Sequence, residues 1–216
     1  MQYYFPSCKF TQMKPETSEK IKQFMETYGV RVAGCCRPGH KVLTGWNVTA
    51  ITICETCSII VRENRPGAKN ISLYEFIDGL TDFPFPDYNG EAITLQDCYR
   101  AKNKDAEKAA IRSVLRKMNV KVVELPGTDE ELRFDGGFLF APISPGNLQL
   151  APRRFGEIQK DVTVKSQEEI DTWLKEYCGR FTTERVACYC NSCYTGLKQG
   201  LPEGKSAVHV AELLFP

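Results

Sequence analysis

Ten cysteines are the residues of this 216-residue chain whose type and spacing point to chemistry. Their number lies below the content of disulfide-stapled proteins, which is above about 8%, and reduced thiolates bind zinc and iron–sulfur clusters or exchange with disulfides. The pattern therefore predicts metal or redox chemistry. The ten comprise one vicinal pair, two CxxC pairs and four others: Cys8, Cys35, Cys36, Cys54, Cys57, Cys98, Cys178, Cys188, Cys190 and Cys193.

In the first half, segments that read as β-strands precede the cysteines. Strands are expected over residues 3–5, 30–34, 50–53 and 71–77, and a helix with one apolar face is expected between Pro15 and Gly29. The first three strands lead to Cys8, to the vicinal pair and to the first CxxC pair, which opens a further helix.

The second half repeats this order. Strands are expected over residues 92–95, 120–125, 186–189 and 207–215, and amphipathic helices over 104–118 and 168–177. Cys98 follows the first of these strands, and the second CxxC pair follows the third. Where a vicinal cysteine pair would be expected, the chain reads Asp135-Gly136-Gly137. The repeated order predicts an internal duplication.

Strands that alternate with helices indicate an α/β fold with largely parallel sheets. We expect two tandem, duplicated α/β subdomains over residues 1–80 and 91–216, joined by a proline-rich linker over 81–90. The carboxyl ends of parallel strands meet at one edge of a sheet. The five cysteines of the first half are therefore expected to converge there, with Arg37, His40 and Lys41 close enough to offset their negative charge.

The motifs Phe5-Pro6-Ser7-Cys8, Cys35-Cys36-Arg37-Pro38-Gly39 and Cys54-Glu55-Thr56-Cys57 form an ordered set, and Cys98 and Cys190-Asn191-Ser192-Cys193 repeat part of it. This set resembles the cysteine-rich CCG domain of heterodisulfide reductase and related redox proteins, over nearly the whole chain. In that family each complete motif binds a non-cubane [4Fe-4S] cluster.

The resemblance implies that Cys8, Cys35, Cys36, Cys54 and Cys57 bind such a cluster here. It also implies an oxidoreductase, or its electron-transfer subunit, that delivers electrons to a small disulfide or thiol substrate. The chain has no G-x-G-x-x-G nucleotide-binding pattern after a strand. We therefore expect the electrons to come from a separate iron–sulfur or flavin subunit.

Two departures from the family pattern stand out. Only seventeen residues separate Cys36 from Cys54, which is shorter than the family usually shows, and Asp135-Gly136 stands where two cysteines are expected. A second metal site, for zinc or a cubane cluster, would then draw on four cysteines of the second half: Cys98, Cys188, Cys190 and Cys193. Cys178 is expected to be a core residue, since it ends the apolar face of a helix.

Two other functions fit the cysteines taken alone. In a zinc-binding structural or interaction module the thiolates would only hold the fold, and in a metal-free oxidoreductase one CxxC pair would act as a dithiol.

Charge and hydropathy argue against a nucleic-acid-binding, a membrane-spanning or a secreted protein. With 28 Lys and Arg against 27 Asp and Glu, no overall field favours nucleic acid. No apolar run reaches the about 18 residues that a membrane span needs. The first residues lack a secretory signal pattern, so a cytoplasmic protein is expected.

Overall fold

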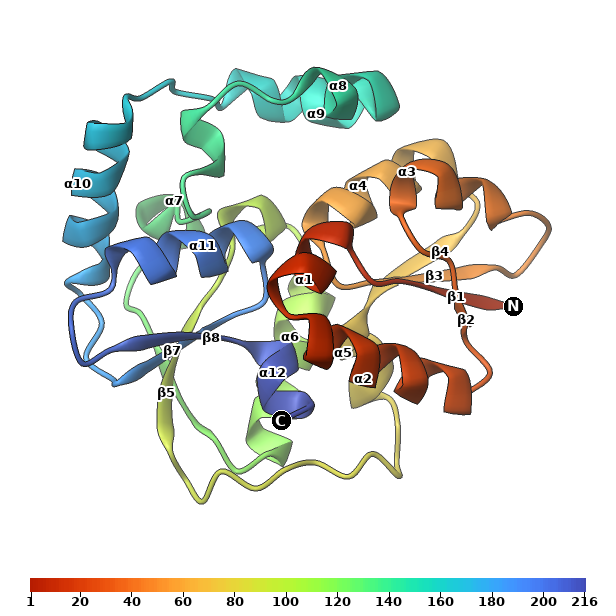
Figure 1. Ribbon diagram of the computed structural model, residues 1–216, viewed down its shortest axis with the longest axis horizontal. Coiled ribbons are helices and arrows are strands. Elements are labelled where there is room, and N and C mark those ends of the chain that lie inside the picture. The colour runs from red at the N-terminus through yellow and green to blue at the C-terminus, as the bar shows by residue number, and fades with distance from the viewer. The chain divides into compact units, whose positions relative to one another are not determined.

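The computed structural model describes residues 1–216, apart from the side chains of Asp129 and Glu130. The chain divides into two compact units, each built on a four-stranded parallel sheet (Figure 1). Unit 1 comprises residues Met1–Gly79, Ile143–Asp161 and Phe215. Unit 2 comprises residues Leu80–Pro142, Val162–Leu214 and Pro216. The expected α/β class with duplicated parallel sheets is confirmed.

The sheet of unit 1 has the strand order β2-β1-β3-β4, and every neighbouring pair is parallel. Its strands are β1 (Gln2–Phe5), β2 (Arg31–Val32), β3 (Thr49–Thr52) and β4 (Lys69–Ser72). The helices of this unit are α1 (Cys8–Met13), α2 (Pro15–Thr27), α3 (Cys36–Gly39), α4 (Glu55–Asn64), α5 (Leu73–Asp78), α8 (Pro145–Leu150) and α9 (Pro152–Lys160).

The sheet of unit 2 has the equivalent order β6-β5-β7-β8, again wholly parallel. Its strands are β5 (Ala92–Gln96), β6 (Lys121–Glu124), β7 (Arg185–Cys188) and β8 (Ser206–His209). The helices of this unit are α6 (Asp105–Lys117), α7 (Asp129–Leu132), α10 (Gln167–Cys178), α11 (Asn191–Gly200) and α12 (Val210–Leu214).

The duplication places corresponding cysteines on corresponding elements. Cys8 follows β1 as Cys98 follows β5, the first strand of each sheet in chain order. Cys54 and Cys190 are the N-cap residues of α4 and α11, the helices that follow β3 and β7. The two halves therefore carry the same framework for a cysteine site at the carboxyl edge of the sheet.

Apolar residues at helical and strand spacing explain the main elements. Helix α2 starts with Pro15 at its first turn and buries Ile21 and Met25, one turn apart, on a single face. Gly29 lies just after the helix and has a φ of 68°. Helices often end with a residue in this left-handed conformation, which glycine adopts without steric cost. Tyr4 and Phe5 point to opposite faces of β1, and both are fully buried. The sheet of unit 1 is therefore covered on both faces at this strand.

The expected strand over 71–77 is wrong beyond Ser72, where β4 ends and α5 begins. A capping box causes the change: the Ser72 hydroxyl accepts a bond from the Glu75 amide, and the Glu75 carboxylate accepts one from the Ser72 amide at 2.7 Å. The two bonds satisfy amides that a helix start leaves open. The sequence Ser-x-x-Glu carried this signal.

The expected terminal strand over 207–215 is likewise too long. β8 ends at His209 and α12 takes the chain on to Leu214. The Glu212 carboxylate accepts a bond from the His209 amide at 2.9 Å, which repeats half of the capping box of α5. Both β4 and β8 therefore end earlier than expected, and at each a glutamate three residues on accepts a bond from the amide of the last strand residue.

Residues 143–161 pack with unit 1, although their neighbours in sequence on both sides belong to unit 2. The Glu63 carboxylate at the end of α4 accepts bonds from the amides of Arg153 and Arg154, each at 2.9 Å, at the start of α9. Phe155 on α9 is fully buried. Unit 2 therefore differs from the expected domain 91–216 in three ways: it begins at Leu80, it lacks residues 143–161, and it lacks Phe215.

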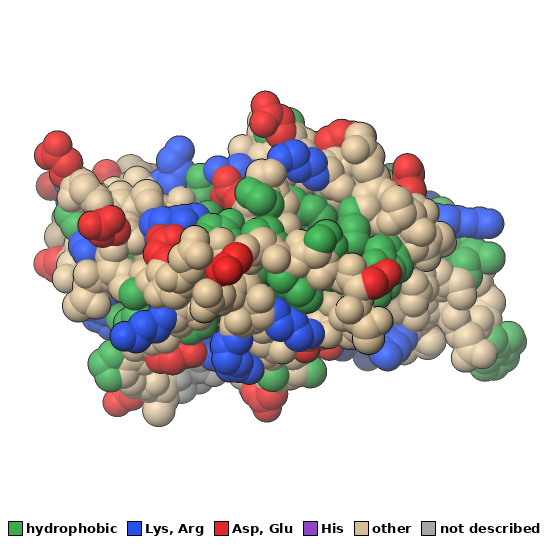
Figure 2. Space-filling view, turned by 90° about the horizontal axis from the view of Figure 1, so that it is seen from below, with side chains coloured by type: hydrophobic (Ala, Val, Ile, Leu, Met, Phe, Trp, Pro, Cys, Tyr) green, Lys and Arg blue, Asp and Glu red, His purple; other side chains and the backbone are tan. Residues whose placement is uncertain are grey.

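None of the helices in the described chain is long and apolar enough to cross a membrane. Figure 2 shows basic and acidic side chains interspersed on one face of the molecule, with apolar groups between them. This agrees with the balanced charge of the sequence.

Candidate metal centres

The five predicted ligands of unit 1 all lie at helix starts that follow strands. Cys8 is the first residue of α1, and Cys35 and Cys36 are the N-cap and first residue of α3. Cys54 is the N-cap of α4, and Cys57 lies in its first turn. Because these helices follow parallel strands of one sheet, their starts meet at its carboxyl edge.

Side-chain interactions link these five thiols, which we call the unit 1 thiol group. Cys8 interacts with Cys35 by a side-chain hydrogen bond and with Cys36 by charge. Cys57 hydrogen-bonds with both Cys36 and Cys54. Three segments that are distant in sequence therefore bring their sulfur atoms together, and a metal cluster with several iron atoms requires such a set of ligands.

Within the unit 1 thiol group, the surroundings favour the thiolate form at Cys36 and disfavour it at Cys8 and Cys57. The hydrogen bond from Cys57 is the main cause that lowers the pKa of Cys36, and the Arg37 charge lowers it further. The pKa of Cys57 is raised well above its usual value by the same hydrogen bond, by Cys54 and by burial. Partial burial raises the pKa of Cys8 to about 11, and Cys35 adds to the effect.

The three basic residues that follow the vicinal pair have different roles. Arg37 places its charge beside Cys36, and its guanidinium donates to the amide oxygen of Asn147 at 3.3 Å. The Nδ1 atom of His40 lies 3.0 Å from the Cys36 carbonyl oxygen in a buried position, whereas Lys41 is exposed. Asn147 comes from the 143–161 segment, and no local pattern indicated its position.

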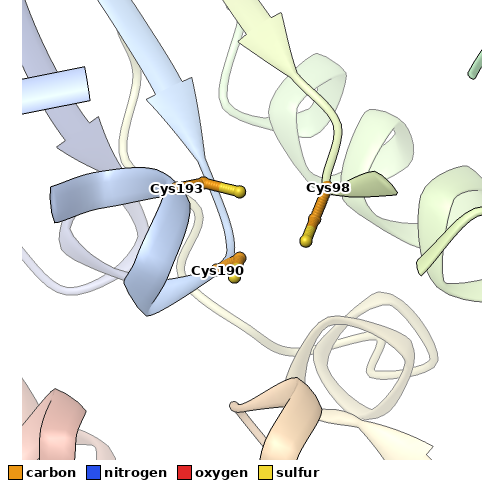
Figure 3. A group of neighbouring side chains, drawn as sticks. All are labelled: Cys98, Cys190 and Cys193. Carbon is orange, nitrogen blue, oxygen red and sulfur yellow. The ribbon is translucent and has the colours of Figure 1, made fainter. Parts of the chain in front are cut away.

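In unit 2, Cys98, Cys190 and Cys193 form a tight group, which we call the triad. Figure 3 shows the three sulfur atoms directed into a common space, Cys98 from the end of β5 and the other two from the start of α11. All three lie within 4.8 Å of one another, and their side chains are 1%, 4% and 0% exposed. Among the described residues, this is the one group of three whose ligand atoms meet so closely.

Cys188, the fourth cysteine expected at this site, lies outside the triad. Its sulfur is 3.8 Å from the carbonyl oxygen of Cys190. Cys188 ends β7, whereas Cys190 caps α11, where the backbone turns and carries its side chain toward Cys98. Cys178 is fully buried in the core, as expected.

Hydrogen bonds make Cys190 the preferred thiolate of the triad. Bonds from Cys193 and Cys98 lower its pKa well below the usual value despite complete burial, and the Arg100 charge acts in the same direction. The Arg100 guanidinium donates to the Cys190 sulfur at 3.2 Å and to the Ser192 hydroxyl at 3.3 Å. Arg100 was not among the residues predicted from the sequence, although it stands two residues after Cys98.

The Asp135-Gly136-Gly137 loop takes the place of the second vicinal cysteine pair. The Asp135 carboxylate is buried and accepts bonds from the amides of Gly137 and Leu139 at 3.0 and 3.1 Å. Burial raises its pKa to about 6, although Arg100 and these two amides act against the shift. The carboxylate therefore holds the loop together and does not join the triad.

A chain of hydrogen bonds holds the backbone of Cys98 in place. The Cys98 amide donates to the Tyr189 hydroxyl at 3.2 Å, and this hydroxyl donates to the Asp97 carboxylate at 3.0 Å. Arg112 then binds Asp97 at 2.6 Å and Glu124 at 2.8 Å. The chain orients the strand end that delivers the Cys98 sulfur.

Tyr189→Phe is expected to lower the free energy of unfolding by about 1–3 kcal/mol, because the buried Cys98 amide loses its partner. Tyr3→Phe is the control, since the Tyr3 hydroxyl donates to the Met1 sulfur at the surface. Urea unfolding followed by circular dichroism measures both. Equal effects of the two substitutions would contradict a supporting role of Tyr189 at the triad.

Comparison with known proteins leaves the family of the chain open. No family model matches it, and no curated protein matches it. One solved structure with similarity is glutamate racemase isoform RacE1 from Bacillus anthracis, at 10% identity and a TM-score of 0.32, over 98% of this chain and 68% of that one. The fold class therefore rests on the two sheets themselves, and the chemistry rests on the cysteines that they position.

Proposed function

We propose that this chain is an iron–sulfur redox protein that binds a non-cubane [4Fe-4S] cluster in unit 1. The observation that carries the proposal is the unit 1 thiol group, in which side-chain interactions link Cys8, Cys35, Cys36, Cys54 and Cys57. These are the five residues that the resemblance to the CCG domain of heterodisulfide reductase selects as cluster ligands.

The number and arrangement of these thiols argue against a single zinc ion. Two thiolates on one zinc ion lie at most about 4.6 Å apart, twice the zinc–sulfur bond of about 2.3 Å. No three of the five, all of them among the described residues, lie within 4.8 Å of one another. The five thiols therefore do not form a single-ion site as they stand, and they exceed the four ligands of a tetrahedral zinc ion.

The surroundings of the unit 1 thiol group suit a charged centre that exchanges electrons. Arg37 offsets negative charge at Cys36, and Asn147 holds the guanidinium in place. Cys8 is exposed, and Cys35 and Cys54 are half-buried, so the group is accessible from solvent. Nearby charge, hydrogen bonds to sulfur and solvent access are the features that tune the potential of an iron–sulfur centre.

The proposed reaction is the reduction of a small disulfide to two thiols. Breaking the sulfur–sulfur bond takes two electrons and two protons, and each sulfur leaves as a thiol. When bound, the cluster would supply electron transfer in single steps. The electrons would come from a separate iron–sulfur or flavin subunit, and the reaction would take place in the cytoplasm, where protein thiols are kept reduced.

Anaerobic purification with iron analysis and electron paramagnetic resonance tests this proposal. The wild-type chain is expected to be brown, with about four iron atoms, and Cys36→Ser is expected to lose most of the iron and the paramagnetic signal. Cys178→Ser is the matched control, because Cys178 is a buried cysteine of unit 2 outside both thiol groups.

Retention of the wild-type spectrum and iron content in Cys36→Ser would overturn the five-cysteine assignment. A colourless wild-type protein that still reduces disulfides would favour the metal-free dithiol alternative instead.

A further inference from the structure

We infer that unit 2 holds a single zinc ion on the triad of Cys98, Cys190 and Cys193, independent of the proposed cluster. Three sulfur atoms within 4.8 Å of one another suit one ion, because two bonds of about 2.3 Å span about 4.6 Å. In a cubane cluster each thiolate binds a different iron, which needs sulfur atoms farther apart. The two halves of a duplicated chain would thus hold different metal centres.

The loop at Asp135 packs tightly against the start of α11, which carries two of the three cysteines. A side chain on Gly136 would overlap the carbonyl group of Ser192, and a Cβ on Gly196 would lie 2.6 Å from the Gly136 Cα. Backbone therefore packs directly on backbone between the loop and the first turns of α11. The Asp135 carboxylate is bound within its own loop, so the three thiols remain as the ligand set.

The charges at the triad suit a divalent ion. Three thiolates and one Zn²⁺ carry a net charge of −1, and the positive charge of the Arg100 guanidinium beside Cys190 offsets it. Arg100 also lies over the Phe138 ring, with 3.8 Å between the guanidinium carbon and the ring centroid. Charges are tolerated inside a protein when they are paired or bind a metal.

The donor set selects the class of metal. Thiolates favour zinc, copper(I) and iron–sulfur centres over magnesium, calcium and manganese, which prefer oxygen ligands. Three cysteines leave the fourth position of a tetrahedral zinc ion to a water molecule or a small thiol. Because the three side chains are at most 4% exposed, we expect the bound ion to exchange slowly.

Metal analysis of the purified chain tests the inference. Wild-type protein is expected to hold one zinc ion per chain, and Cys98→Ser and Cys190→Ser are each expected to lower zinc content at least tenfold. Cys188→Ser is the matched control and is expected to keep the zinc, because Cys188 is buried two residues from Cys190 but lies outside the triad.

A second measurement does not depend on the folding of a variant. Chelator-treated wild-type protein is titrated with Co²⁺, which is expected to give the visible absorption bands of a tetrahedral thiolate site, saturating at one ion and displaced by Zn²⁺. Equal zinc in Cys188→Ser and Cys190→Ser would overturn the inference, as would saturation without these bands.

Iron measured in the same samples separates this inference from the proposed function. Cys36→Ser is expected to lose iron and keep zinc, while Cys190→Ser loses zinc and keeps iron. Zinc at one per chain without any iron would support the triad and overturn the cluster. Iron without zinc, in protein expressed with added zinc, would support the cluster and overturn the zinc site at the triad.

Discussion

Gly136→Ala is expected to lower the free energy of unfolding by about 3 kcal/mol or more. Gly136 has φ of +70°, where an alanine costs roughly 1–2 kcal/mol. Its new methyl group would also overlap the Ser192 carbonyl, and overpacking typically costs about 1–3 kcal/mol. Backbone atoms cannot rotate away as a side chain can, so the two costs add.

Gly137→Ala is the matched control for this prediction. Gly137 is the next residue of the same loop and also has a positive φ, +84°. A Cβ there would meet only side chains at ordinary contact distance, 3.5 Å from Ile170 and 3.6 Å from Phe140. We therefore expect a loss of about 1–2 kcal/mol from the backbone conformation alone.

Urea unfolding of the two variants measures the difference between them. Gly136→Ala is also expected to lower the zinc content, because Ser192 lies between the two cysteines of the CxxC pair and must move to admit the methyl group. Equal stability of the two variants would show that the loop does not press on α11 as the structure indicates.

Phe155→Ala is expected to cost about 3–5 kcal/mol, the usual range for removing a fully buried phenylalanine. Phe155 anchors α9, which contacts α4 in unit 1. Its loss leaves a cavity under the 143–161 segment, so we also expect faster cleavage of this segment by a protease.

Arg154→Ala is the control on the same helix. Its side chain is exposed, and its contact with Glu63 uses the backbone amide, which alanine keeps. We expect a change within about 0.5 kcal/mol. Thermal unfolding and limited proteolysis measure both variants, and a Phe155→Ala protein as stable as Arg154→Ala would show that α9 is not held by its buried face.

Local patterns were enough to predict the framework of both units. The repeated order of strand, cysteine, helix and CxxC predicted two duplicated parallel sheets, because buried strands and amphipathic helices impose different apolar periods on a sequence. The same order predicted that Cys54 and Cys190 would hold equivalent positions at helix starts. Even the early ends of β4 and β8 had local signals, in Glu75 and in Glu212.

Contacts between distant segments had no such local signal. Asn147 reaches Arg37 across 110 residues of sequence, and the burial of Phe155 in unit 1 depends on the path of the whole 143–161 segment. An amphipathic helix shows which face it buries, but its sequence does not state which sheet will cover that face. The assignment of α8 and α9 to unit 1 was therefore a matter of tertiary structure.

For the triad of unit 2, too, the sequence determined some features and the tertiary structure decided the others. The sequence by itself determined that Cys98, Cys190 and Cys193 would lie at strand ends and that Asp135-Gly136 would replace two thiols. Tertiary structure decided that the sulfur of Cys188 turns to a carbonyl oxygen, that Arg100 lies beside Cys190 and that the Gly136 backbone packs on α11. Residue type and spacing specify which groups can act as ligands, whereas the direction of each side chain depends on where the backbone turns and on what packs against it.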